Sequence, residues 1–346
     1  MANKSLFASY AGKLMPRAKV RNRAGAPAYE LEARHKLAQL VMTGTLSPTY
    51  YASAATQLAD VMEVAEIVSP EFLSKAAVYA RKRGHMKDMP ALLLAVLSRR
   101  DPVAFARAFS LVVDNGRMLR TFVQIMRSGT TGRKSLGSRP KSSIQGWLNT
   151  ASDRALMRAA VGQSPSLADI IKMVHPKPAS PERRAFYAWL VGKPYDVAAL
   201  PDPARSFEAF KRDRTNPLPD VPFEMLTALD LTAEHWAQIA GKAGWHMLRM
   251  NLNTFDRQCA FAIDGFAEMV AARLKDPAEI AKARVMPYQL MAAYMAADRD
   301  VPHVVREALQ DALDISLSNV PAVTGNVVIA PDVSGSMRSA VTGRRK

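Results

Sequence analysis

The residues with the clearest chemical potential in this sequence form a short basic stretch, Gly129–Lys141. It holds Arg133, Lys134, Arg139 and Lys141 among glycine, serine and threonine, so backbone amides, hydroxyls and cations are all available to a phosphate. The GxxxxGKS or GxxxxGKT pattern of a nucleotide-binding P-loop does not occur. The stretch therefore predicts a contact with a nucleic-acid backbone, and the alternative is a merely solvated basic loop.

Helical segments before this stretch carry further cations. The pattern predicts a helix over Met118–Arg127, on which Arg127 adjoins the stretch and Arg120 lies one to two turns back. Three more candidates for phosphate contact surround the Gly84-His85 pair: Arg81, Arg83 and Lys87.

The net charge of the 346-residue chain is concentrated in this region. The 47 lysines and arginines exceed the 31 acidic residues by 16, and residues 73–142 alone carry a net charge of +12. Residues 1–28 carry +6, residues 29–72 carry −4, and the remainder is almost neutral. A charge gathered in this way is typical of a polyanion-binding surface, so nucleic acid is the first expected partner. No window approaches the roughly eighteen apolar residues of a membrane-spanning helix, so no membrane partner is expected.

Residues 1–28 and the cysteine content indicate the compartment. The N-terminal residues are basic but lack the apolar core and cleavage site of a secretory signal, which favours a basic arm on a cytoplasmic protein. The single cysteine, Cys259, excludes an internal disulfide and a cysteine metal cage, which agrees with a reducing compartment. Its apolar neighbours predict a thiol in the core.

The sequence pattern predicts that short helices position these cations. Ser69-Pro70 and Asp101-Pro102 each place a side-chain acceptor at a helix N-cap and proline in the first turn. Segments such as Ala91–Leu97 and Phe105–Val113 are apolar around much of their circumference and need neighbours on several sides, as in stacked helix pairs. The fold class is therefore all-α, an irregular HEAT-like solenoid, with the proline-rich Lys193–Pro222 expected as a long surface connection inside it.

The C-terminal residues break the helical pattern. Val327–Ala330 predicts one orphan β-strand, and Asp332, Ser334 and Ser336 follow it at the spacing of hard oxygen ligands for Mg²⁺. Three such ligands form an incomplete metal site. No cofactor is required by the sequence, and Mg²⁺ is expected only if further residues of the same domain are supplied.

Several motifs, in the same order, resemble the TROVE module of the Ro ribonucleoprotein family. They are Ala80–Pro90, Ser128–Gly137, Met173–Pro178 and Lys282–Tyr288, and Asp332–Ser336 then resembles the first loop of a von Willebrand factor A domain. The resemblance implies a basic arm at residues 1–28, a helical ring at residues 29–325, and an A-domain fragment at residues 326–346.

The resemblance also implies a function in RNA quality control. In this family a ring of HEAT-like helices takes single-stranded ends of misfolded or unprocessed RNA into a basic central hole. Structured, Y-like RNA binds the outer surface, and bacterial members act as adaptors for an exoribonuclease or an RNA-repair enzyme. No catalysis is implied, and the six histidines show no zinc-protease spacing.

Further site residues follow from this resemblance. The family's outer-surface histidine matches His175, with Lys177 beside it and Arg158 upstream, whereas Gly162 stands where another cation is expected. Arg249 and Asn253, four residues apart on one predicted helix face, and Arg284, at a helix break, are candidates for lining the hole or for helix packing. The alternative function is a helical protein–protein scaffold with a basic docking face.

Overall fold

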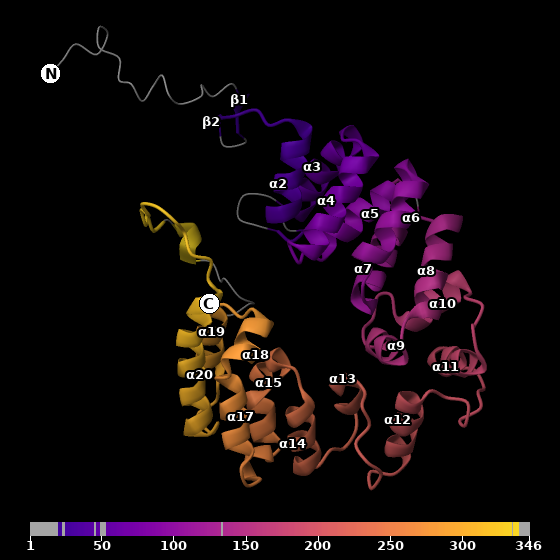
Figure 1. The fold of residues 1–346 in the computed structure, drawn as a ribbon, viewed down its shortest axis with the longest axis vertical. Helices are drawn as coiled ribbons and strands as arrows, with labels where there is room; N and C mark the ends of the chain where they lie inside the picture. Colours follow the sequence, from indigo (N-terminus) through magenta and orange to yellow (C-terminus); the bar gives the residue numbers. More distant parts are fainter. Residues whose placement is uncertain are drawn as a thin grey trace, which may run out of the picture. The chain divides into compact units, whose positions relative to one another are not determined.

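The computed structural model describes residues 20–22, 25–44, 46–48, 53–132, 134–333 and 335–338, with only the backbone at 336 and 338. Across these residues the chain is almost entirely helical, which confirms the all-α class (Figure 1). It divides into two compact units, Met1–Tyr195 and Asp196–Lys346. The expected ring closure, and domain limits at residues 28 and 325, stay predictions.

The N-terminal unit begins with a short antiparallel pair and continues as helices. Its elements are β1 (Val20–Arg21), β2 (Pro27–Ala28), α2 (Ala33–Thr43), α3 (Ala54–Ile67), α4 (Pro70–Lys82), α5 (Asp88–Arg100), α6 (Pro102–Val112), α7 (Gly116–Ser128), α8 (Ser138–Thr150), α9 (Asp153–Ala160), α10 (Leu167–Val174) and α11 (Pro181–Val191). In the two-stranded sheet Val20 lies opposite Ala28.

The C-terminal unit consists of shorter helices. Its elements are α12 (Asp202–Arg212), α13 (Phe223–Leu226), α14 (Ala233–Lys242), α15 (Trp245–Met250), α16 (Leu252–Arg257), η1 (Ala260–Ala262), α17 (Phe266–Leu274), α18 (Pro277–Ala283), α19 (Pro287–Ala296), α20 (His303–Ser316), η2 (Leu317–Asn319) and η3 (Gly335–Arg338). No helix among the residues described in either unit is long and apolar enough to cross a membrane.

The predicted helix starts are confirmed by their caps. The Ser69 hydroxyl accepts from the Phe72 amide at 3.3 Å, and the Asp101 carboxylate accepts from the Val103 and Ala104 amides at 2.9 and 3.0 Å. Each cap satisfies amides that have no partner inside the helix, and proline in the first turn has no amide to satisfy. These caps fix where α4 and α6 begin.

Helix α5 is the centre of the N-terminal unit. Every residue from Met89 to Ser98 is buried, and α4, α6 and α7 pack around it. This confirms that the apolar segment Ala91–Leu97 has neighbours on several sides. Phe105, Phe109 and Phe122 add an aromatic cluster on α6 and α7, with ring centroids 5.6–5.8 Å apart.

The predicted core position of Cys259 is wrong. Helix α16 ends at Arg257, and Cys259 adopts a left-handed conformation with φ +55° before the η1 turn. This reversal takes the thiol off the buried helix face, so Cys259 is exposed. The aromatic rings of Phe255 and Phe266 fill that part of the core, 5.8 Å apart.

Two further predictions are corrected by the structure. The proline-rich segment Lys193–Pro222 contains helix α12, because proline is compatible with a first helical turn and three apolar side chains on one face are buried: Ala204, Phe207 and Phe210. The orphan strand at Val327–Ala330 is absent, and this segment is irregular and exposed. A lone strand has no described neighbour to satisfy its backbone groups.

The packing around α5 predicts a large effect of cavity creation. Leu93→Ala removes a fully buried side chain and should lower the free energy of unfolding by about 2–5 kcal/mol. Urea denaturation followed by circular dichroism measures it. Val103→Ala, at a side chain that is 53% exposed, is the control and should change stability by no more than about 0.5 kcal/mol. Equal losses in the two variants would contradict this description of the core.

Candidate nucleic-acid interface

The backbone of the loop between α7 and α8 is positioned by a left-handed glycine and by a hydrogen bond from α7. Gly129 turns the chain at the end of α7 with φ +85°, and the Arg127 guanidinium donates to the Lys134 carbonyl at 3.0 Å. Leu136 and Thr131 are buried, whereas the Lys134 side chain is exposed. The loop therefore presents Lys134 from a held backbone. Arg133, which the sequence placed beside it, lies outside the described residues.

Helix α8 begins with uncompensated positive charge. Arg139 and Lys141 are exposed near its start, the N-cap Gly137 offers no side-chain acceptor, and the first turn has no acidic residue. Cations at this end of a helix are unfavourable unless an anion is nearby, because the helix dipole is positive there. Free amides and cations together form a surface suited to phosphate.

The turn after α10 is docked on the same helix. Gln145 donates to the Val174 and His175 carbonyls at 2.7 and 3.3 Å, and Asn149 donates to the Lys177 carbonyl at 2.8 Å. His175 itself is left-handed, with φ +50°, and its side chain and that of Lys177 are exposed. The sequence prediction of a helix-end histidine facing solvent is thus consistent with the geometry.

A buried tyrosine holds this arrangement. The Tyr187 hydroxyl donates to Asn149 Oδ1 at 3.0 Å. Burial raises the pKa of Tyr187 to about 12, so the hydroxyl keeps its proton at neutral pH. Asn149 is therefore oriented to donate its amide to the turn.

Helix α8 joins the loop and the turn into one surface. Lys141, Gln145 and Asn149 recur every four residues and share a face, so Lys141 lies one helical turn from the docked His175 backbone. We call the following exposed side chains the loop–turn surface: Lys134, Arg139, Lys141, His175 and Lys177. They come from the α7–α8 loop, the start of α8 and the turn docked on α8.

Arg120 has a structural role instead. Its guanidinium donates to the carbonyls of Ala159, at 2.8 Å, and Val161 at the end of α9. Burial, together with the charge of Arg117, lowers its pKa. Arg158, on α9 itself, is exposed. Arg120 is therefore committed to joining α7 to α9, and Arg158 is the cation of this pair that faces solvent.

Of the three candidates around Gly84, one has a structural role and two are exposed. Arg81 contacts both carboxylate oxygens of Asp114, the shortest distance being 2.7 Å, and also donates to the Met86 carbonyl at 3.2 Å. Arg83 and Lys87 are exposed and have no side-chain ion pair with a described residue. Arg81 thus links α4 to the start of α7, while the other two remain available.

The three candidates of the C-terminal unit lie at helix ends. Arg249 donates to the Gln289 carbonyl at 2.7 Å and lies over the Trp245 ring at 5.9 Å, and burial lowers its pKa. Asn253 donates to the Ala296 carbonyl at 2.9 Å. Arg284 is exposed as the left-handed C-cap of α18. Arg249 and Asn253 therefore stabilise helix ends.

The metal prediction at the C-terminus is only partly within the structure. Asp332 is exposed, Ser334 lies outside the described residues, and so does the side chain of Ser336. Among the described residues no group of three or more histidine, cysteine or acidic side chains could hold a metal ion. Mg²⁺ binding stays a prediction.

Sequence reasoning missed an exposed aromatic residue beside the available cations. Tyr79 on α4 is 59% exposed, and it borders a groove that Arg83 and Arg107 also line. The spacing of Tyr79 and Arg83, four residues apart on one helix, was the available signal. An exposed aromatic ring with arginines along the same groove is typical of a surface that binds flat, anionic ligands.

The fold and the surface together define an all-α, solenoid-like protein with a localised basic surface. No protein-family model matches the chain. It is 26% identical over 362 residues to the RNA-binding protein RO60 of Deinococcus radiodurans, an alignment that covers 92% of this chain and 66% of that protein. The crystal structure of the Deinococcus radiodurans Ro (RSR) protein matches with a TM-score of 0.63 and 22% identity, over 84% of this chain and 65% of that one.

These two matches confirm the resemblance to Ro proteins of the bacterial type. The chain spans about two thirds of the length of the curated relative that it matches. The structural match supports the helical solenoid fold.

The Arg81–Asp114 pair predicts a pH dependence of stability. Burial alone would raise the pKa of Asp114, but hydrogen bonds and charge from Arg81 and Lys82 outweigh it and hold the pKa below its ordinary value of 3.8. Because the folded-state pKa is lowered, the pair stabilises fully above the unfolded-state pKa and is lost as pH falls through the folded-state pKa.

Asp114→Asn tests this role. At pH 7 the variant should be less stable by about 1–3 kcal/mol, because Arg81 loses a charged hydrogen-bond partner. Below about pH 4 the difference from wild type should shrink. Urea unfolding at pH 7, 5 and 3.5 measures both effects, and a difference that stays constant over this range would contradict the ion-pair explanation.

Proposed function

We propose that this chain binds RNA through the loop–turn surface of its N-terminal unit. The observation that carries the proposal is the convergence on α8 of exposed cations from a held loop, a helix start and a docked turn. Lys134, Arg139, Lys141 and Lys177 have no ion pair with any described residue, so their charges are available to a polyanion. The similarity to an RNA-binding protein supports RNA as that polyanion.

The finer function follows the Ro-like resemblance. Phosphate contacts from Lys134, Arg139 and Lys141 hold single-stranded ends of misfolded or unprocessed RNA, with shape and charge dominating over base identity. The His175 turn, further along α8, takes structured, Y-like RNA. The protein then acts in RNA quality control as an adaptor that presents RNA to an exoribonuclease or an RNA-repair enzyme. Capture in a central hole requires the ring closure that the resemblance implies.

Removing three cations of the loop–turn surface should weaken RNA binding and its salt dependence together. The Lys134→Ala, Arg139→Ala, Lys141→Ala triple variant should bind a single-stranded RNA about tenfold more weakly. The slope of log K against log salt should fall in magnitude by about 2, because each lost phosphate contact in single-stranded RNA contributes about 0.7. Fluorescence anisotropy at 50–300 mM KCl measures both quantities.

A matched variant controls for the loss of net charge. Arg212→Ala, Lys242→Ala, Lys282→Ala removes three exposed cations from the C-terminal unit and should leave affinity within about twofold of wild type. Equal effects of the two triple variants, or a wild-type affinity that does not change with salt, would refute the proposed surface. Weak RNA binding with tight binding of an acidic protein would favour the scaffold function instead.

The His175 turn predicts selectivity for structured RNA. His175→Asn, Lys177→Ala should weaken binding of a stem–loop RNA more than binding of an unstructured strand of equal length. Asparagine tolerates the left-handed backbone of His175, so the turn on α8 should persist. Competition between the two RNAs measures the ratio of affinities. A ratio equal to that of wild type would show that the turn does not read RNA structure.

A further inference from the structure

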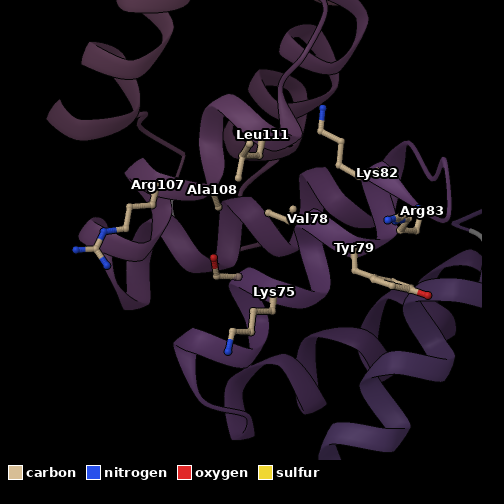
Figure 2. Close-up of a pocket in the computed structure, with 9 residues that line it drawn as sticks. Lys75, Val78, Tyr79, Lys82, Arg83, Arg107, Ala108 and Leu111 are labelled. Carbon is tan, nitrogen blue, oxygen red and sulfur yellow. The ribbon is translucent and has the colours of Figure 1, made fainter.

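A hollow surface on the N-terminal unit is separate from the loop–turn surface. A groove of about 450 Å³ lies between α4 and α6, with Val78, Ala108 and Leu111 forming apolar wall and Tyr79 at its border (Figure 2). Leu111 is 47% exposed and Tyr79 is 59% exposed. Large apolar side chains left in water next to one another are typical of a binding site.

Cations surround this apolar wall. Lys75 forms an ion pair with Glu71 at 2.7 Å, and Lys82 contacts Asp114 at 3.4 Å, so both are partly neutralised. Arg107 comes from α6, and in Figure 2 it lies on the opposite side of the groove from Arg83.

Arg83 and Arg107 differ from the two lysines in their partners. Neither guanidinium forms an ion pair or hydrogen bond with a described residue. Two guanidinium groups that keep their full donor capacity are suited to phosphate, which they can contact through two hydrogen bonds each.

Tyr79 also borders a second hollow with different chemistry. This hollow, of about 330 Å³, lies between α2 and α4 and is lined mainly by apolar side chains, including Val41, Met42 and Phe72. Anions would be poorly solvated there, whereas a planar apolar surface is well accommodated. The arrangement fits a ligand that combines a flat ring with flanking negative charge.

We infer that the groove between α4 and α6 binds a short stretch of single-stranded RNA. One base stacks on Tyr79, and phosphates of the strand contact Arg83 beside it and Arg107 on the opposite side of the groove. Stacking on an aromatic ring with arginine at the backbone is a general mode of single-strand binding. The inference rests on the proposed RNA-binding function for its ligand, but it uses none of the residues of the loop–turn surface. An acidic peptide would neutralise Arg83 and Arg107, but its carboxylates would not stack on the Tyr79 ring.

Two probes separate the base from the phosphates. One is a fluorescein-labelled 10-residue oligoadenylate, and the other is the same strand with abasic sugars. Tyr79→Ala should weaken oligoadenylate binding about five- to a hundredfold and leave abasic-strand binding unchanged, because only the base stacks. Tyr79→Phe keeps the ring and should remain within about threefold of wild type. Arg83→Ala, Arg107→Ala should weaken both probes.

Tyr288→Ala is the matched control. Tyr288 lies in the C-terminal unit and is 53% exposed, close to the exposure of Tyr79, so its removal should not change affinity. Thermal unfolding of each variant shows whether the fold is retained. Exposed positions such as these usually change stability by less than about 0.5 kcal/mol when substituted.

The outcomes distinguish this inference from the proposed function. Unchanged oligoadenylate binding by Tyr79→Ala overturns the inference that the groove binds RNA. The triple variant of the loop–turn surface still tests RNA binding at the loop–turn surface. Loss in Tyr79→Ala with no loss in that triple variant supports the groove and refutes the loop–turn surface. A polyglutamate peptide that displaces oligoadenylate, and loses affinity equally in Tyr79→Ala, would identify an acidic protein as the ligand and overturn the inference.

Discussion

The fold depends on hydrogen bonds from arginine to the carbonyl groups that helix ends leave unpaired. The last four carbonyls of a helix have no partner inside it, and helices of this length have a large share of such groups. In each case the donor and its acceptors lie about thirty to forty residues apart in the sequence. Arg100 donates to Ala65 and Val68 after α3, Arg120 to Ala159 and Val161 after α9 in the reverse direction, Arg183 to Ala151 after α8, and Arg273 to Ala240 and Ala243 after α14.

This use of arginine changes the meaning of the net charge. The excess of cations in residues 73–142 predicts a binding surface, but some of these cations are hydrogen-bonded to groups of the protein itself. Arg81 is held by Asp114, and Arg100 and Arg120 by backbone carbonyls. The charge that remains for a ligand belongs to exposed side chains, such as Lys134, Arg139 and Lys141, that have no ion pair with a described residue. A guanidinium that replaces water at a helix end stabilises the stack without contributing to a phosphate site.

Short sequence patterns were sufficient to predict where helices begin. They were insufficient to predict which partner each cationic side chain would have. The caps at Ser69 and Asp101 lie within three residues of the amides they satisfy, so sequence predicted them. Helix α7, at Gly116–Ser128, includes the predicted helix Met118–Arg127. For Arg249 and Asn253 the sequence left lining of the hole and helix packing open, because their partners lie forty and forty-three residues away. Contacts at that separation depend on how the stack is assembled, which short patterns do not encode.

Gly162 shows how stability and RNA binding compete for one position. The Ro-like pattern places a cation there, yet the residue has φ +115°, and a Cβ would lie 2.5 Å from a guanidinium nitrogen of Arg120. Glycine is therefore required by the backbone and by the space that Arg120 fills. A cation at this position would have to displace the contact that joins α7 to α9. Arg120 fills that space, so the cations on this side are exposed arginines of α9 such as Arg158, and under the proposed function the His175 turn supplies the rest of the RNA affinity there.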